Sequence, residues 1–578
     1  MTHLRAPDHA VYATERHEIV DAVVVGAGFA GLYMLYRLRE RGLRVRVIEA
    51  GADVGGTWYW NRYPGARCDA QSLLYSYSFS EDLQDEWSWS EKYATQPEIL
   101  EYIRYVADRF RLRSQIWFET RVASAHFDEA HTIWEVHTDS GDRVTARYLI
   151  MATGCLSVGR VPDLPGLDET GLEIYHTGSW PHEGMDFTGK RVGVVGTGSS
   201  GIQLIPELAR QAKGLVVFQR TPNFSVPARN GPLDPDDVTE FTEHRQSIRE
   251  AWRSGNLIGA GEKLQPDNTF MRPVSALAVS EEERQREFEG RWNEGGAFFV
   301  GAFNDLATDL RANETAADFV NDKIRTTVSD PATAKTLIPT GYPLGAKRIC
   351  VGSDYFETFN RQNVELVDLR ERPIERITAD GIAVVGGEFK LDALVFATGF
   401  DAMTGALLRM DITGVGGLAL GDKWKDGPGT YLGLMTSGFP NMFMITGPGS
   451  PSVLGNVVCH IEQHVDMIAD LLDRSREDGL ECITVEREAE ERWVQTVNEV
   501  ADATLYTKAE SWYLGSNVPG KPRVFMPFAG GIGAYRDICE QVVGDDYAGF
   551  SRTPAGAADL SADRQVTSSI QKSDRENV

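Results

Sequence analysis

The sequence predicts an α/β protein with two Rossmann-like domains and a helical insertion. Residues 19–50 and 190–220 each read as a buried apolar strand, a glycine-rich turn, an amphipathic helix and a second strand, which is a βαβ unit. Between residues 234 and 334 the sequence becomes charged and helix-favouring, with Glu and Arg at i,i+3 and i,i+4 spacings. A chain of 578 residues is long enough for two or three such domains.

These patterns suggest domain boundaries. We expect the following division: one discontinuous domain of residues 1–155 and 395–550, a second of residues 156–233 and 335–394, an insertion of residues 234–334, and a tail of residues 551–578. The tail is rich in Ser, Ala and charged residues and almost lacks large apolar side chains, so we expect it to be disordered.

Charge and composition exclude several classes of partner. With 58 basic and 84 acidic residues the formal net charge is −26, which repels nucleic acids and anionic lipid surfaces. No run approaches the roughly 20 apolar residues that cross a bilayer, and the N-terminal residues lack the apolar core of a secretion signal. We therefore expect a cytoplasmic protein. The six cysteines have no CxxC spacing, so the sequence indicates neither a metal site nor a redox dithiol.

The first glycine turn contains Gly26, Gly28 and Gly31 in GxGxxG spacing directly after the predicted strand. Such a turn lets the backbone approach a pyrophosphate, whose charge the helix N-terminus stabilises. Glu49 ends the second strand, where a carboxylate accepts hydrogen bonds from both ribose hydroxyls of a dinucleotide without a 2′-phosphate. FAD or NAD fits this site.

The second turn repeats the spacing with Gly196, Gly198 and Gly201, but Arg220 stands where Glu49 stands in the first unit. A guanidinium there forms a forked pair with a 2′-phosphate, which favours NADP(H) over NAD(H). Either turn alone could be merely structural. Together they indicate a flavoprotein that takes hydride from NADPH, and since no neighbouring cysteines could receive the electrons, oxygen is the expected acceptor.

A further motif follows the first unit. Residues 55–69, GGTWYWNRYPGARCD, match the pattern [A/G]GxWxxxx[F/Y]P[G/M]xxxD. The matched positions are Gly55, Gly56, Trp58, Tyr63, Pro64, Gly65 and Asp69. In this motif the chain resembles the type I Baeyer–Villiger monooxygenases, class B flavoprotein monooxygenases. In the segment GPGSPSVLGN it resembles their phenylacetone and steroid monooxygenase subgroup. Similar segments include GTGSSGIQ, FQRTP, GAKR, GPGSPS and SWYLGSNVPGKPRVF, so the resemblance extends from about residue 20 to 550.

The family fingerprint FxGxxxHxxxW[P/D] is only partly kept. His176, Trp180 and Pro181 are in register, whereas Thr170 and Leu172 stand where Phe and Gly are expected. The resemblance gives His176 a hinge or linker role, and a hydrogen-bonded structural histidine is the alternative interpretation. We do not assign His176 to catalysis.

The resemblance implies an enzyme that uses FAD, NADPH and O₂ to convert ketones to esters or lactones through a peroxide anion at flavin C4a. A fixed cation can keep the peroxide anionic and then stabilise the tetrahedral adduct. Arg348, in GAKR, is the candidate, and Asp69 would pair with it and fix its position. An ordinary structural salt bridge is the alternative interpretation of this pair.

Further cofactor-binding residues are implied by the resemblance alone. They are Thr57, Trp58, Asp69 and Tyr75 beside the flavin and nicotinamide, Ser199 and Ser200 in the second turn, Thr221 and Lys347 with Arg220 at the 2′-phosphate, Arg348, and Trp512 in a mobile loop over NADP⁺. The aromatic residues could equally belong to the core, and a lone lysine is usually a surface residue.

Two other functions stay open. A flavin monooxygenase that oxidises nitrogen or sulfur would share both cofactors, but a soft heteroatom needs the protonated hydroperoxide, so Asp69 with Arg348 favours attack on a ketone. A non-catalytic flavin redox sensor is the third possibility. The segment GPGSPSVLGN suggests aromatic or bulky cyclic ketones as substrates. His460 and His464 lie one helical turn apart but lack the HExxH pattern of a zinc site, so we expect them to be core or surface residues.

Overall fold

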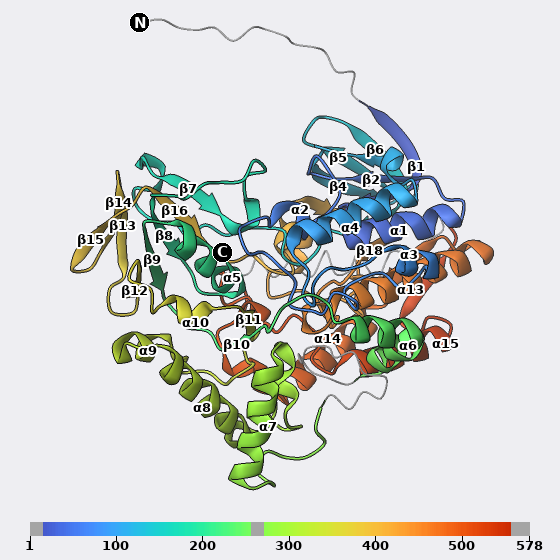
Figure 1. The fold of residues 1–578 in the computed structure, drawn as a ribbon. Helices are drawn as coiled ribbons and strands as arrows, with labels where there is room; N and C mark the ends of the chain where they lie inside the picture. The colour runs from blue at the N-terminus through green and yellow to red at the C-terminus, as the bar shows by residue number, and fades with distance from the viewer. Residues whose placement is uncertain (1–15, 256–270, 556–578) are drawn as a thin grey trace, which may run out of the picture.

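The computed structural model describes residues 16–255 and 271–555. Two sheets, each flanked by helices, lie side by side, and helices α7 to α9 lie below them in the view of Figure 1. The predicted α/β class and both βαβ units are confirmed. In the described part of the chain, no helix is both long and apolar enough to cross a bilayer.

The first sheet is built around β1 (His17–Val25), which leads into α1 (Phe29–Glu40) and β2 (Val45–Ile48). Its order is β17-β4-β5-β6-β1-β2-β3, and β18 also pairs with β6. The remaining strands are β3 (Ile116–Trp117), β4 (Val122–Asp128), β5 (Ile133–Thr138), β6 (Arg143–Met151), β17 (Asp411–Thr413) and β18 (Met442–Met444). Strands from both halves of the sequence therefore share this sheet.

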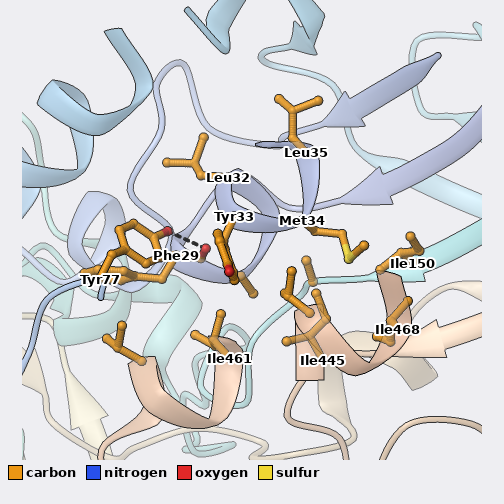
Figure 2. Packing of buried hydrophobic residues seen from close by; sticks show 14 of the residues in the cluster. Phe29, Leu32, Tyr33, Met34, Leu35, Tyr77, Ile150, Ile445, Ile461 and Ile468 are labelled. Atoms are coloured by element: carbon orange, nitrogen blue, oxygen red, sulfur yellow. Dashed lines mark hydrogen bonds between the residues drawn. The ribbon is translucent and has the colours of Figure 1, made fainter. Parts of the chain in front are cut away.

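Helix α1 is packed between this sheet and α13 (Val457–Glu477). Figure 2 shows Phe29 and Tyr33 of α1 facing Ile461 of α13, and the hydroxyl of Tyr77 donates to the Phe29 carbonyl at 2.5 Å. At the solvent edge Arg37 pairs with Asp466. Apolar burial, which contributes about 1.5–3 kcal/mol for each large side chain, thus holds the helix of the first glycine turn in place.

The second sheet is entirely parallel, with the order β12-β9-β8-β16-β7. Its βαβ unit consists of β8 (Arg191–Val195), α5 (Ser199–Gln211) and β9 (Gly214–Gln219). The other strands are β7 (Glu173–His176), β12 (Val364–Asp368) and β16 (Ala393–Phe396). An antiparallel sheet of β13 (Ile374–Thr378), β14 (Gly381–Val384) and β15 (Gly387–Lys390) lies at its edge (Figure 1).

The predicted insertion of residues 234–334 contains the helices α6 (Pro235–Arg253), α7 (Glu281–Glu294) and α8 (Leu310–Thr327). A fourth helix, α9 (Pro331–Leu337), begins within the insertion and ends three residues beyond its predicted boundary at residue 334. Phe241 of α6 is buried in the core of the first sheet, whereas Phe288 of α7 and Phe319 of α8 are buried in the core of the second. The insertion therefore packs against both halves, and its boundaries as a domain stay a prediction.

The first residues of the predicted tail are part of a strand. Strand β20 (Phe550–Thr553) pairs with β19 (Cys482–Val485), so residues 551–553 are paired in a sheet although the tail was predicted from 551. Backbone hydrogen bonds to β19 stabilise this strand, although its sequence is polar. Residues 556–578 lie outside the described residues.

The chain passes between the two halves in two crossover segments, residues 155–160 and 399–403, which lie antiparallel to each other. The amide of Arg160 donates to the carbonyl of Gly399 at 2.9 Å, and the amide of Asp401 donates to the carbonyl of Val158 at 2.9 Å. His176 is buried beside them, with its ring edge-on to Phe400.

His176 is a buried, hydrogen-bonded histidine, and its linker role stays a prediction. Its Nδ1 accepts a hydrogen bond from the Gly178 amide at 3.0 Å, and burial lowers its pKa, so the ring is neutral. At the altered fingerprint positions Thr170 donates to the carbonyl of Thr378 at 2.7 Å, and Leu172 is buried against β13 and β14. Both departures are thus accommodated by local packing.

Candidate active site

The first glycine of each turn adopts a backbone conformation that L side chains rarely take. Gly26 has φ +107° and Gly196 has φ +109°. A Cβ atom would lie 2.6 Å from the carbonyl oxygen of Ala152 in the first turn and 2.5 Å from that of Ala397 in the second. Both turns therefore require glycine for the same reason, the close approach of the neighbouring strand.

The other glycines permit close packing or leave space. A Cβ on Gly31 would lie 1.8 Å from the Gly26 carbonyl oxygen, and one on Gly201 would lie 2.3 Å from that of Gly196. A Cβ on Gly198, in contrast, would meet no protein atom within 4 Å. Packing within the protein therefore does not explain why residue 198 is glycine. Binding of a pyrophosphate does, because the phosphate must come close to the backbone of the turn.

Glu49 directly follows β2 and is 5% exposed. Its carboxylate accepts hydrogen bonds from the amides of Ala27 and Gly51, both at 2.7 Å. Burial raises its pKa, and these two hydrogen bonds oppose that shift. Since a carboxylate has about four acceptor positions, Glu49 can still accept a hydrogen bond from a ribose hydroxyl of a dinucleotide.

Arg220, which follows β9, is within electrostatic range of both Lys347 and Arg160, and we call these three cations the phosphate cluster. Arg220 is exposed after β9. Burial and the charge of Arg220 lower the pKa of Lys347 and that of Arg160. The structure thus places three predicted residues near one another, namely Arg220, Thr221 and Lys347. The sequence analysis did not identify Arg160, because it belongs to no motif. A phosphate-binding role for these cations stays a prediction.

The motif of residues 55–69 connects the two halves. At its start the Cα atoms of Gly56 and Gly28 are so close that a Cβ on Gly56 would lie 3.0 Å from Gly28 Cα. Further along, the hydroxyl of Tyr63 donates to Gln203 of α5 at 2.8 Å, and a Cβ on Gly65 would lie 2.6 Å from the Gln203 carbonyl oxygen. The motif therefore contacts the first turn and the helix of the second.

The motif ends at Asp69, which forms a two-pronged ion pair with Arg348. Nε and Nη2 of Arg348 each donate to one Asp69 carboxylate oxygen at 2.8 Å. Nη1 donates to the carbonyl of Val453 at 2.7 Å, so all three nitrogens have acceptors. Arg348 precedes β11 (Cys350–Gly352), which pairs with β10 (Ser225–Pro227) after the second βαβ unit.

The charges of this pair stabilise each other. Burial disfavours the charged form of both side chains, but the partner's charge and hydrogen bonds outweigh it. The pKa of Asp69 is therefore lowered and that of Arg348 is raised well above its usual value. Arg348 stays a cation, held in one orientation.

Trp58 and Tyr75 are buried close to this pair. The indole Nε1 of Trp58 donates to the hydroxyl of Tyr75 at 3.1 Å, and their rings meet edge to face. Burial raises the pKa of Tyr75 well above its usual value. Thr57 is exposed at the start of α2 (Thr57–Trp60). Contact of these residues with a flavin stays a prediction.

Trp512 lies in a segment that rests on the crossover segments. We call residues 511–525 the docked segment; its first turn is η8 (Trp512–Leu514). The half-buried indole packs against the apolar cluster of Ala402, Met403 and Met526. The side-chain amide of Asn517 donates to the carbonyl of Phe400 at 2.7 Å, and Lys521 pairs with Asp401 at 2.6 Å. The coenzyme-covering role of Trp512 stays a prediction.

A pocket that opens to solvent adjoins the ion pair. Asp69 and Arg348 are its charged lining residues. The apolar and aromatic wall includes Ala297, Val300, Leu306, Leu344, Leu454, Leu505, Tyr506 and Tyr513. Sequence reasoning missed this wall because its residues come from several separate segments without a shared motif.

His460 and His464 are both buried in α13. Of the two locations expected from the sequence, the core and the surface, the core is confirmed. His464 accepts from the Thr446 amide at 3.0 Å and contacts the Tyr535 hydroxyl at 2.7 Å. Burial lowers the pKa of each histidine to about 3. Within residues 16–255 and 271–555, no group of three or more His, Cys, Asp and Glu side chains could hold a metal ion.

Known proteins similar to this chain share its whole architecture. Residues 23–251 match the family model described as pyridine nucleotide-disulphide oxidoreductase. A Baeyer–Villiger monooxygenase of Pseudooceanicola batsensis is 44% identical over 537 residues, which are 92% of this chain and 96% of that protein. Phenazine N-monooxygenase PhzNO1 of Lysobacter antibioticus is 44% identical over 534 residues, with the same two shares.

Solved structures agree. Oxidised steroid monooxygenase bound to NADP is 52% identical, with a TM-score of 0.87 over 93% of this chain and 100% of that one. A complex of OTEMO with FAD and NADP is 40% identical, with a TM-score of 0.87 over 92% of this chain and 99% of that one. The cofactors predicted here are those bound in these relatives. Both turns, the motif and the relatives place this chain in the Baeyer–Villiger monooxygenase family, the NADPH-dependent flavoprotein enzymes of that name.

Proposed function

We propose that this protein converts ketones to esters or lactones with FAD, NADPH and O₂, and that Arg348 and Asp69 are its catalytic residues. The observation that carries this proposal is the two-pronged ion pair between them, which lines a pocket together with aliphatic and tyrosine side chains. It combines a fixed cation with a space for a neutral organic substrate.

The protein's own groups have distinct tasks. Bound flavin supplies the electrons that activate oxygen. Arg348 presents a permanent positive charge where negative charge develops on oxygen as the ketone carbonyl is attacked. Asp69 orients that guanidinium, and the carbonyl of Val453 holds its third nitrogen. The apolar wall limits the access of water, which strengthens these interactions.

The residues present fit both cofactors. Gly26, Gly28, Gly31 and Glu49 would hold the pyrophosphate and ribose of FAD, and Gly196, Gly198 and Gly201 those of NADPH. Ser199 and Ser200 begin α5 at its N-terminus, beside the second pyrophosphate position. The phosphate cluster would bind the 2′-phosphate, together with Thr221.

The substrate class follows from the wall of the pocket. Aliphatic and tyrosine side chains surround the ion pair. A neutral aromatic or bulky cyclic ketone buries apolar surface there, whereas a carboxylated substrate would place a second anion beside Asp69. The steroid monooxygenase among the relatives supports bulky cyclic substrates.

A ketone panel tests the function. NADPH consumption, O₂ uptake and ester formation are measured together for aliphatic, aromatic and cyclic ketones. We expect ester or lactone in near-stoichiometric amounts with NADPH for at least one bulky ketone. NADPH consumption that yields only hydrogen peroxide throughout the panel would contradict the proposal.

N-oxidation is the second candidate, because a phenazine N-monooxygenase is as similar to this chain as the first relative named above. A phenazine and an organic sulfide therefore belong in the same panel. Turnover of these substrates without any ester from ketones would favour this alternative. Failure of the reduced flavin to turn over with any acceptor would favour a redox sensor.

Coenzyme preference gives a separate prediction. Arg220→Ala is expected to weaken NADPH binding by about tenfold to a hundredfold and NADH binding much less, since one charge-assisted contact of about 1.5–3 kcal/mol is lost. The dissociation constants of both coenzymes are measured by titration. Arg210→Ala is the matched control, because Arg210 is an exposed arginine of α5 that pairs with Glu207 and Asp354. Equal losses for both coenzymes would argue against a phosphate contact.

A further inference from the structure

The pocket wall beside Arg348 is assembled from separate segments of the chain. Leu306 and Ala307 lie just before α8, and Leu344 lies four residues before Arg348. Leu505, the first residue of η7 (Leu505–Lys508), belongs to a third segment, and its amide donates to the carbonyl of Ala307 at 2.8 Å. A backbone hydrogen bond thus joins the first and third segments, whereas a side chain joins the first and second.

That side chain is Asn313, the fourth residue of α8, which is 1% exposed. Its Nδ2 donates to the carbonyl of Leu306 at 2.7 Å and to the carbonyl of Leu344 at 2.8 Å. Its Oδ1 accepts a hydrogen bond from the amide of Leu344 at 2.9 Å. Three of the four hydrogen-bonding positions of this side chain are therefore used, and all three partners belong to residues of the pocket wall.

Helix packing does not explain an asparagine at this position. The buried residues around it on α8 include Ala312, Ala316 and Phe319, which are all apolar. Burying a side-chain amide is unfavourable unless its polar atoms are paired, so packing alone would favour an apolar residue here. The hydrogen bonds to Leu306 and Leu344 account for the asparagine.

The loop that begins at Leu344 is also fixed at its other end. Arg348 pairs with Asp69, and the amide of Cys350 donates to the carbonyl of Phe224 at 3.0 Å. Asn313 thus fixes the start of the loop that carries the catalytic arginine. Since Asn313 is not one of the side chains that line the pocket, it acts through the two leucines and not by touching a substrate.

We propose that Asn313 is a positioning residue that fixes the pocket wall beside Arg348 and thereby determines which ketones the enzyme accepts. Without its hydrogen bonds, Leu306 and Leu344 are free to move apart. A bulky ketone then loses apolar contacts that a small ketone does not make. This inference rests on the substrate class of the proposed function.

Ketone binding to the FAD-loaded enzyme tests the inference without turnover. The probes are 2-phenylcyclohexanone, which is bulky, and cyclobutanone, which is small, and calorimetric titration gives their dissociation constants. Asn313→Asp keeps the size of the side chain but removes both donors to the carbonyls, and Asn313→Ala removes all three hydrogen bonds while leaving space for water. In both variants we expect the dissociation constant of 2-phenylcyclohexanone to rise about tenfold or more and that of cyclobutanone to change less than about twofold.

Hydrogen exchange at the Leu344 amide gives a second measurement that needs no ketone. In Asn313→Ala this amide loses its protein acceptor, so exchange in peptides covering residues 340–348 should be about tenfold faster than in the wild type. In Asn313→Asp the carboxylate can still accept from this amide, so exchange should stay closer to that of the wild type. Exchange at the wild-type rate in Asn313→Ala would contradict the proposed anchoring of the loop.

Asn441→Asp is the matched control. Asn441 is 0% exposed and likewise joins two segments, because its side chain donates to the carbonyl of Glu481 at 3.0 Å and accepts from the amide of Ile483 at 2.8 Å. None of these three residues belongs to the pocket wall. This control should lower the melting temperature without changing the ratio of the two ketone dissociation constants. FAD content establishes that each variant is folded.

The results separate this inference from the proposed function. An unchanged ratio in both Asn313 variants, or an equal change in Asn441→Asp, would overturn the inference even if the wild type forms esters normally. Failure of the wild type to bind either ketone would overturn it as well. A size-dependent loss of affinity that is specific to Asn313 would support it even if the bound ketones are not converted to esters.

Discussion

Arg348→Ala is expected to lower ester formation by at least about 10²- to 10³-fold, while the enzyme still binds FAD and is still reduced by NADPH. The reason is that removing one donor that stabilises a developing oxyanion has effects of this size. Flavin reduction is followed by absorbance under anaerobic conditions, and ester is measured in single-turnover reactions after oxygen is added. Reduction within a few-fold of wild type, together with loss of ester, is the expected result.

Two variants of the same ion pair sharpen this test. Arg348→Lys keeps the charge but cannot form the two parallel bonds to Asp69 or reach Val453 in the same geometry, so we expect most of the loss to persist. Asp69→Asn keeps the shape of the partner and removes its charge, so the guanidinium is oriented less firmly. Ester formation at the wild-type rate in Arg348→Ala would refute the catalytic role of this arginine.

Gly198→Ala is expected to weaken NADPH and NADH alike, by about five- to a hundredfold, with little change in the stability of the protein. Its φ of −82° suits alanine, and the added methyl group meets no protein atom within 4 Å. It would instead occupy the space of the pyrophosphate, and overpacking costs about 1–3 kcal/mol. Coenzyme titration and thermal unfolding of the same preparation measure the two effects.

Gly214→Ala is the matched control, because a Cβ there also meets no protein atom within 4 Å, at the start of β9 and away from the turn. It should leave coenzyme affinity unchanged. Alanine at a helix N-cap costs up to about 1 kcal/mol relative to glycine, so a small fall in melting temperature is compatible with the prediction. Unchanged coenzyme affinity in Gly198→Ala would place the pyrophosphate elsewhere.

Local patterns were sufficient to predict the βαβ units and the turns. The spacing of Gly26 and Gly28, the apolar strand before them and the acid at Glu49 all act within one short stretch of chain. The same holds for Gly196 and Arg220. Period and turn chemistry are local properties, and the structure reproduces them in both halves.

What the sequence could not predict depends on contacts between distant segments. The Val453 carbonyl that holds Arg348 and the pocket wall at Leu306 and Leu505 are brought together only by tertiary packing, and a carbonyl carries no signal in the side-chain sequence. Arg160 follows a recognisable strand-turn segment, yet its partner Asn517 lies 357 positions away in the chain. The pairing of Asp69 with Arg348 was expected only because the chain resembles a known family.

The stretch from Gly56 to Asp69 has a consequence for how the two redox cofactors would be spaced. Gly56 packs against Gly28 of the first turn, and Tyr63 hydrogen-bonds to α5, the helix of the second. Asp69, the last residue, pairs with Arg348. Because it is fixed at three points, this stretch sets the distance between the two nucleotide turns. Adding or deleting a single amino acid within this stretch would misalign the nicotinamide and the flavin for hydride transfer, even though neither nucleotide-binding turn had changed. Selection should therefore remove such length variants far more strictly than substitutions.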